Sequence, residues 1–452
     1  MMMKLHKLPS MSHRFASAVR RAGLIICLFA LAGCADKEVR LSGDREDVLS
    51  DLRTLMIDGQ ASAELAGLGN AVVNSAFGHP GVTSAHDGGH LSLDLPLKQL
   101  WKARIEETES DVVMLAQPVI VNGKVFALGA DALVSVFDLE TGKVLATEQI
   151  DDAQAGLFPG VAGGLAANEK VLIAHAGRKM LTAIDSNTNQ ILWSVENSEP
   201  LAGGPTLIGN EGVIVTDIDG STLAFRLNDG ALVWQTTGLP AETVVLGSGS
   251  PTVHEGTTIV AGIGGEVSAN AVADGKLIWA DSLATLAPRT PLEELGDILA
   301  NPVHDGDAVY VVSQSGILGA FDSLTGIQLW EQPISSVQMP WVAGESLFVL
   351  TTSSHLVALR KSDGAVRWHT DLPGSAELAA ISATDVTRYF GPIVAAGQVH
   401  VLSSSGRIYS LNADTGVLVD KQSLSGAVNV DPIIAQNTLV VLTSSGRLVA
   451  WR

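Results

Sequence analysis

The chain is built from short apolar runs, rich in Val, Ile and Leu, that break repeatedly at Gly, Asn or Asp. This spacing is typical of β-strands joined by tight turns, whereas an amphipathic helix needs apolar residues at i, i+3 and i+4 over about ten or more residues. One unit is clearest at Gly316–Asp322, which is followed by a turn at Gly326 and then by Trp330. The last residues of the chain, 445–452, repeat the first part of this unit. The pattern predicts an all-β protein made of repeats.

Eight copies of this unit are present. Their first parts lie at Ala132 to Asp138, Lys179 to Asp185, Gly220 to Arg226, Gly265 to Ala271, Gly316 to Asp322, Ser354 to Arg360, Gly406 to Asn412 and Ser445 to Arg452. Dividing residues 97–452 by eight gives about 44 residues per unit, and a four-stranded propeller blade has roughly 40–45. We therefore predict an eight-bladed β-propeller of four-stranded antiparallel blades.

The two ends of the repeat region complement each other. The last unit stops after its third strand, at Arg452, while an isolated strand-like segment, Leu97–Ile105, precedes the first full unit and contains Trp101. Pairing this segment with the last unit would supply the missing fourth strand and leave no open sheet edge at the seam. We expect the N-terminal strand to close the last blade.

Six Trp residues occupy the same place in their repeats. They are Trp101, Trp193, Trp234, Trp279, Trp330 and Trp368. A stacking platform for a sugar or a cofactor would need one or two of them, whereas the same residue in most blades indicates an architectural role. We expect each Trp to pack between neighbouring blades.

Residues 1–33 have the features of an export signal. The segment carries five basic residues and no acidic one, and its apolar core, Ala22–Leu31, is too short to span a bilayer as a helix. The core ends in Leu31–Cys34 (Leu-Ala-Gly-Cys), which resembles the bacterial lipobox, whose Cys becomes lipid-modified. We predict a lipoprotein signal peptide at 1–33, a lipidated tether and irregular strap at 34–95, and the propeller at 96–452.

Net charge and cysteine content limit the classes of partner that the protein can bind and indicate where it is located. The chain has a net charge of −20, so nucleic acid and anionic headgroups are unsuitable partners. Its only other Cys, Cys27, lies in the predicted signal, so Cys34 would be alone in the mature protein. By the sorting pattern of bacterial lipoproteins, Ala35 after the lipidated Cys favours the outer membrane, where the protein would lie on the periplasmic face.

The repeat resembles the quinoprotein (PQQ-like) propeller repeat. Enzymes with that repeat bind pyrroloquinoline quinone and calcium on the propeller axis, and the alcohol dehydrogenases among them carry a vicinal disulfide. This chain lacks such a Cys pair, a Cys-x-x-Cys-His haem motif and a clear Asp/Asn/Glu calcium set. We expect no cofactor, no catalytic residues and no enzyme activity, with a quinoprotein dehydrogenase as the less favoured alternative.

His79, His86 and His90 form the one His cluster of the chain. The His86–His90 spacing would suit a metal on a helix, but Pro80, Gly81 and two further glycines disfavour a helix there. A loop leading into the strand at 97–105 is the preferred interpretation, and we predict no metal site.

A lipobox ahead of a PQQ-like propeller without a cofactor site resembles the BamB family of outer-membrane assembly lipoproteins. Leu41–Leu49, the stretch from Phe77 to His90 and the loop Leu295–Pro302 are similar to segments of that family. The resemblance implies a scaffold that binds the POTRA domains of BamA within the barrel-assembly machinery and aids outer-membrane protein assembly. It also implies contact with unfolded outer-membrane protein clients.

The resemblance further implies that the loops entering blades four and five contact the partner. Here these are about 243–251 and 291–302, and the candidate residues are Leu246, Leu292, Glu293, Glu294, Leu295 and Asp297. We expect both loops to emerge on the same side of the ring. Propellers also bind exposed strands or glycans, so a module for periplasmic clients or cell-wall glycan stays an alternative.

Overall fold

The computed structural model describes residues 55–105, 116–129, 131–151, 162–237, 248–283, 297–373 and 387–452. The predicted signal peptide and Cys34 lie outside these residues. Within them, none of the helices is long and apolar enough to cross a membrane. The helical elements described are two short 3-10 turns, η2 (Ala61–Ala63) and η3 (Ile263–Gly265).

The described residues form eight four-stranded antiparallel sheets, here called blades. Blade 1 contains β2 (Val119–Val121), β3 (Lys124–Leu128), β4 (Leu133–Asp138) and β5 (Val144–Gln149); blade 2 contains β6 (Gly164–Ala167), β7 (Val171–His175), β8 (Met180–Asp185) and β9 (Ile191–Glu196); blade 3 contains β10 (Leu201–Ile208), β11 (Gly212–Asp217), β12 (Thr222–Arg226) and β13 (Leu232–Thr236); blade 4 contains β14 (Thr252–His254), β15 (Thr257–Ala261), β16 (Glu266–Ala271) and β17 (Leu277–Ser282).

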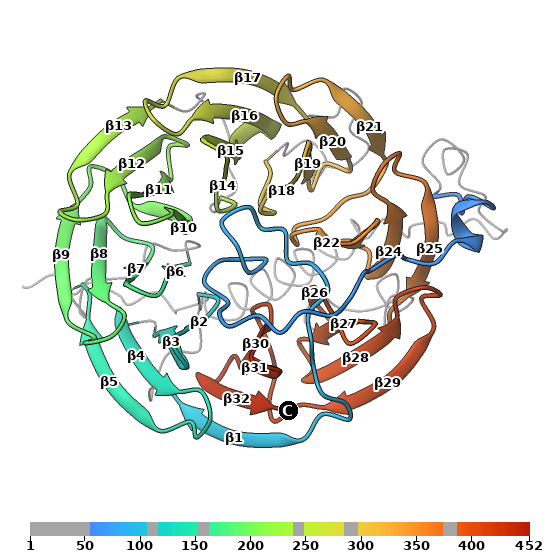
Figure 1. The fold of residues 1–452 in the computed structure, drawn as a ribbon, viewed down its shortest axis with the longest axis horizontal. Coiled ribbons are helices and arrows are strands. Elements are labelled where there is room, and N and C mark those ends of the chain that lie inside the picture. The colour runs from blue at the N-terminus through green and yellow to red at the C-terminus, as the bar shows by residue number, and fades with distance from the viewer. Residues whose placement is uncertain are drawn as a thin grey trace, which may run out of the picture. The chain divides into compact units, whose positions relative to one another are not determined.

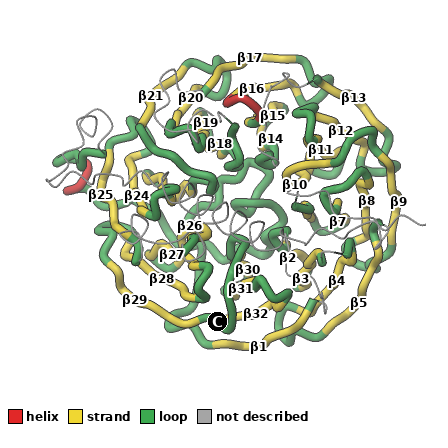
Figure 2. The backbone as a smooth tube through the Cα atoms, turned by 180° about the vertical axis from the view of Figure 1, so that it is seen from behind, coloured by secondary structure: helices red, strands yellow, loops and turns green. Residues whose placement is uncertain are grey.

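The second half of the chain repeats this order. Blade 5 contains β18 (Val303–Asp305), β19 (Ala308–Val312), β20 (Leu318–Asp322) and β21 (Gln328–Gln332); blade 6 contains β22 (Trp341–Ala343), β23 (Ser346–Leu350), β24 (His355–Arg360) and β25 (Val366–Asp371); blade 7 contains β26 (Tyr389–Ala395), β27 (Gln398–Ser403), β28 (Arg407–Asn412) and β29 (Leu418–Ser423); blade 8 contains β30 (Ile433–Ala435), β31 (Thr438–Leu442), β32 (Arg447–Trp451) and β1 (Gln99–Arg104). The blades stand around a common centre (Figures 1 and 2), which confirms the predicted all-β propeller.

Burial differs between the strands of a blade. The second and third strands are buried along almost their whole length, as in β3 and β23, because other blades cover both faces of their sheet. The outer strands, such as β9, alternate between exposed and partly buried residues. The apolar runs of the sequence therefore form the inner three strands of each blade. The segments with a weaker alternating pattern form the outer strands, which make up the rim of the propeller.

The ring closes through its two ends. Strand β1 pairs antiparallel with β32, with Trp101 opposite Ala450 and Arg104 opposite Arg447. Blade 8 thus takes its outer strand from the N-terminal side of the propeller and its other three strands from the C-terminus. The predicted closure of the last blade is confirmed.

Each of the six Trp side chains lies against the turn of the following blade. The Trp279 indole donates a hydrogen bond from Nε1 to the Ser323 carbonyl oxygen at 2.9 Å. A Cβ atom at Gly326, in the same turn, would lie 2.6 Å from the Trp279 ring, so this position has no room for a side chain. Gly326 also has a φ of +72°, in the left-handed region. The other five Trp residues make the same pair of contacts, with glycines Gly142, Gly230, Gly275, Gly364 and Gly416.

The irregular segment 70–98, here called the strap, crosses the centre of the ring (Figure 1). It bonds to the inner strands of all eight blades in order around the axis. Its contacts run from Asn74 with Ile434 (blade 8) through Phe77 with Ile120, Gly78 with Ala167, His79 with Leu207, Ser84 with Val253, Ala85 with His304 and Gly89 with Val342 to Leu91 with Val394 (blade 7). Val72 then pairs with Leu91, so that the strap meets itself. The strap is a second closure of the ring, independent of β1.

Candidate functional site at the loop face

The outer strand of each blade ends on the same face of the ring on which the inner strand of the next blade begins. This follows from the four antiparallel strands of each blade, because the fourth strand ends on the side where the first begins. We call this side the loop face. The two predicted partner loops connect such strands, β13 with β14 and β17 with β18. The flanking residues of both loops therefore lie on the loop face, in adjacent blades.

Five of the six predicted partner residues, Leu246, Leu292, Glu293, Glu294 and Leu295, lie outside the described residues. Asp297 is described, and its side chain is buried. Its Oδ1 accepts a hydrogen bond from the Gly264 N–H at 2.7 Å. The next residue, Ile298, donates its N–H to the Gly262 carbonyl. Asp297 thus faces η3 of blade 4 and fixes the base of the second loop.

The bases of the two loops are also bonded to each other. The Ser250 N–H donates to Asn301 Oδ1 at 2.7 Å, and Ser250 Oγ accepts from the Gly204 N–H at 2.8 Å. These bonds connect blade 3 to blade 4 and blade 4 to blade 5. A Cβ at Gly249 would lie 2.7 Å from the Ala300 carbonyl oxygen, so the two loop ends are also in close contact. The described ends of the two predicted partner loops are therefore joined directly to each other.

A cavity of about 250 Å³ lies on the axis among the residues that begin the inner strands. All eight blades contribute to it, and the strap contributes Pro80. Its lining consists of Pro80, Gln117, Gly163, Gly164, Leu165, Gly204, Ser250, Asn301, Gln338, Phe390, Asn429, Val430 and Asp431. The strap bonds further along the same inner strands, since Gly164 and Gly204 line the cavity while Ala167 and Leu207 contact the strap. The cavity thus lies on the loop-face side of the strap.

The cavity lining does not fit a quinone cofactor with its metal. Asp431 is its one acidic residue, and it contains no Lys or Arg to neutralise an anionic quinone. Burial raises the pKa of the Asp431 carboxyl to about 6, although the Gly391 N–H donates to it at 2.6 Å. Calcium takes six to eight oxygen ligands, commonly with several carboxylates. No group of three or more His, Cys, Asp or Glu suited to a metal occurs in the described part of the chain.

The three clustered histidines each hold the strap to a different part of the ring. His79 Nε2 accepts the Leu207 N–H at 3.1 Å, His86 Nδ1 donates to the Pro302 carbonyl at 2.9 Å, and His90 Nε2 accepts the Gly397 N–H at 2.8 Å. Burial lowers the pKa of His79 to about 3, with a smaller contribution from neighbouring His86, and burial lowers that of His86 to about 4. Both rings are neutral at pH 7 and serve as hydrogen-bonding groups of the strap.

A profile of the family described as "Outer membrane protein assembly factor BamB" matches residues 130–370 and 375–451. This chain belongs to the BamB family. It is 25% identical over 360 residues to outer membrane protein assembly factor BamB of Yersinia pestis, covering 78% of this chain and 88% of the relative. It is 28% identical over 363 residues to the BamB of Burkholderia pseudomallei, covering 79% and 88%.

Solved structures agree on the fold. The crystal structure of BamB from Moraxella catarrhalis superposes with a TM-score of 0.66 at 20% identity, covering 79% of this chain and 99% of that one. Quinohemoprotein alcohol dehydrogenase from Comamonas testosteroni superposes with a TM-score of 0.64 at 13% identity, covering 87% and 84%. At such identities the likeness concerns the propeller alone. The PQQ-like repeat of the BamB family therefore occurs on the same fold as the dehydrogenases.

Proposed function

We propose that this chain is a non-enzymatic scaffold lipoprotein of the machinery that assembles outer-membrane β-barrels. In this proposal Cys34 carries the lipid anchor, the propeller lies on the periplasmic side of the outer membrane, and the loop face binds the POTRA domains of BamA. Family membership supports the role in assembly. The chemistry of the axial cavity, with one carboxylate and no cationic side chain in its lining, favours a scaffold over a quinoprotein enzyme.

The observation that carries the proposed interface is the bonded base of the two partner loops. Ser250 and Asn301 join adjacent blades, so apolar and acidic side chains of both loops would be presented from one support. Apolar residues rimmed by charge suit a specific interface. We infer that Leu246 and Leu295 provide the apolar contacts and that Glu293 and Glu294 provide the charged rim.

We expect the double substitution Leu246→Arg and Leu295→Arg to weaken capture of BamA POTRA domains by at least tenfold, because charge at an apolar contact costs roughly 2 kcal/mol or more. The measurement is the Kd for purified POTRA domains by biolayer interferometry. Leu324→Arg is the matched control, since Leu324 is 75% exposed in the β20–β21 turn on the opposite face. Unchanged affinity of the double variant would place the interface elsewhere. Retention on cell-wall glycan without BamA capture would favour the glycan-binding alternative.

A further inference from the structure

The axial cavity contains a carboxylate that has no cationic partner in the described part of the chain. Asp431 precedes the first strand of blade 8, and its Oδ1 accepts a hydrogen bond from the Gly391 N–H of blade 7 at 2.6 Å. None of the ion pairs among the described residues includes Asp431. The residue lines the cavity and is partly exposed. Its second oxygen, Oδ2, is therefore the anionic group that the cavity offers to a ligand.

Neutral hydrogen-bonding groups accompany this carboxylate. Four side-chain amides line the cavity, and they come from the residues that lead into blades 1, 5, 6 and 8, namely Gln117, Asn301, Gln338 and Asn429. The oxygen of an amide accepts hydrogen bonds without adding a second negative charge. Gln338 donates through Nε2 to the Tyr389 carbonyl at 3.5 Å, so its Oε1 is the atom left to accept a hydrogen bond. The cavity thus combines one anion with several neutral acceptors.

Apolar side chains form another part of the lining. Leu165, Phe390 and Val430 contribute aliphatic and aromatic surface. The volume of about 250 Å³ is below the roughly 300–1,000 Å³ that is usual for sites of drug-sized ligands. The cavity therefore suits a single side chain or a small molecule with an apolar stem and a polar end.

The charge of the lining favours a cation over a neutral or anionic ligand. Burial raises the pKa of Asp431 to about 6, because the charged form is poorly solvated there, and a cation beside it would stabilise that form. No Lys or Arg of the lining could receive an anion. A neutral sugar could bond to the amides but would leave the carboxylate uncompensated. The net charge of −20 also attracts cations to the protein.

The geometry at Asp431 favours an ammonium over a guanidinium. A guanidinium binds a carboxylate best through two parallel N–H bonds, which require both oxygens, and here the Gly391 N–H already occupies Oδ1. An ammonium is a compact charge with three rotatable donors. One donor can meet Oδ2 of Asp431 while the other two meet amide oxygens, and the attached methylenes can contact the apolar side chains.

We propose that the axial cavity binds an alkylammonium group, which enters from the loop face, pairs with Asp431 and packs its methylenes against Leu165, Phe390 and Val430. Two sources supply this group: a lysine side chain of a partner protein and a free aliphatic amine. The inference goes beyond the proposed function, because it uses the axis of the ring and none of the candidate BamA contacts in the loops at 243–251 and 291–302.

The test is ligand-observed saturation-transfer NMR with an acetylated and amidated tripeptide whose central residue is lysine. A matched peptide carries norleucine, which keeps the methylenes and lacks the charge. We expect the lysine peptide to bind at least tenfold more tightly than the norleucine peptide. Asp431→Asn should weaken binding of the lysine peptide at least tenfold, although Asn keeps an acceptor for the Gly391 N–H. Asp274→Asn is the control, since it removes the same charge from an exposed turn between β16 and β17 on the opposite face, and it should leave the Kd unchanged.

Putrescine, titrated in the same way, distinguishes the two sources. Tighter binding of putrescine identifies a free amine as the ligand, and tighter binding of the lysine peptide identifies a partner's side chain. The inference is refuted if neither amine binds the wild type, if the norleucine peptide binds as tightly as the lysine peptide, or if Asp431→Asn binds the lysine peptide as the wild type does. An equal loss in Asp431→Asn and Asp274→Asn would also refute it, because the effect would then be one of net charge. Capture of POTRA domains is measured separately, so failure of this site leaves the scaffold function standing.

Discussion

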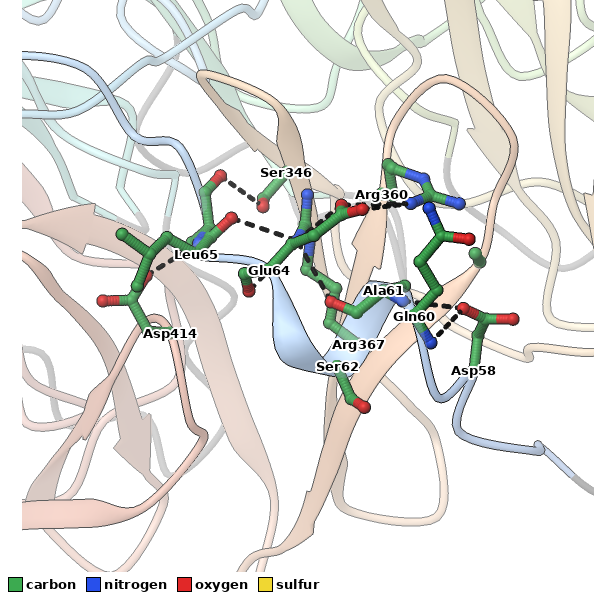
Figure 3. A network of polar contacts seen from close by, with 12 residues as sticks. Asp58, Gln60, Ala61, Ser62, Glu64, Leu65, Ser346, Arg360, Arg367 and Asp414 are labelled. Carbon is green, nitrogen blue, oxygen red and sulfur yellow. Dashed lines mark hydrogen bonds and ion pairs between the residues drawn. The ribbon is translucent and has the colours of Figure 1, made fainter.

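At the residue scale, Arg367 is the informative exception in the repeat. Seven blades carry Leu, Ile or Val at its position, so comparison of the copies alone could have marked it. The sequence did not predict the partner of Arg367. That partner is residues 57–66, called the latch, which lie beside β25 (Figure 3) and show no periodicity that predicts this position. The Arg367 side chain is buried and donates hydrogen bonds to backbone carbonyls of the latch, whereas the equivalent aliphatic side chains are exposed.

We expect Arg367→Leu to release the latch. The substitution removes the hydrogen bonds from Arg367 to the carbonyls of Ala61 and Leu65, and hydrogen bonds from charged groups are worth about 1.5–3 kcal/mol each. Hydrogen exchange of residues 57–66 should rise at least tenfold while the blades stay protected. Arg226→Leu is the control, because Arg226 is exposed and pairs with neighbouring Asp229. Unchanged exchange in Arg367→Leu would mean that other contacts, such as Ala66 N–H to Asp414, suffice to hold the latch.

Also at this scale, Asp297 shows a limit of sequence reasoning. An Asp in a loop beside Leu and Glu suggests a solvent-facing contact, but its carboxylate is buried and bonds to Gly264 of the preceding blade. The difference arises from the close packing of adjacent blades, which no local pattern reports. Its role in the proposed interface is to position the loop.

At the element scale, the repeat alone predicted most of the architecture. Strand number, turn positions and the closure by β1 follow from apolar runs that recur with Gly and Trp at fixed offsets. The path of the strap did not follow, because its bonds to the eight blades are made one residue at a time and mostly through backbone groups. The three His residues of the strap suggested a possible metal site in the sequence. In the structure they form hydrogen bonds between the strap and the ring.

The closing strand makes a quantitative prediction. Trp101 is buried, bonds to the Leu139 carbonyl at 2.7 Å and packs on Gly142 of blade 1. Trp101→Ala should lower the free energy of unfolding by about 3–5 kcal/mol, measured by urea denaturation. Leu100→Ala, at the neighbouring half-exposed position, should change it by less than about 1 kcal/mol. Equal effects of the two substitutions would contradict a closing role for Trp101.

At the scale of the whole molecule, buried histidines make stability depend on pH. Burial lowers the pKa of His79 to about 3 and that of His86, His175, His304 and His400 to about 4. Between pH 6.5 and 4 the unfolded chain therefore binds more protons, so stability falls as pH falls. Asp431, with its pKa raised to about 6, acts in the opposite direction over pH 6 to 4, and burial also raises the pKa of Asp217 and of Glu266. The five histidines outnumber these three carboxyl groups, so we expect the net effect to follow the histidines.

We expect the free energy of unfolding, measured by urea denaturation, to decrease steadily from pH 6.5 to 4.5. Each buried histidine contributes up to about 1.4 kcal/mol per pH unit to this slope. His79→Gln retains an acceptor for the Leu207 N–H without a titrating ring and should reduce the slope by one such share. A slope that is flat in the wild type, or unaltered in His79→Gln, would show that these rings titrate alike in the folded and unfolded chain.

The strap has a consequence for the order of events during biogenesis. Its Asn74 side chain bonds to Ile434, 360 residues later, and its remaining partners are distributed over every blade between. Contacts of such sequence separation form late and slow folding. The strap is synthesised before every blade, yet it can complete its bonds only after the last blade exists. A chain truncated before blade 8 therefore loses the β1–β32 pairing and the bond from Asn74 to Ile434 at once.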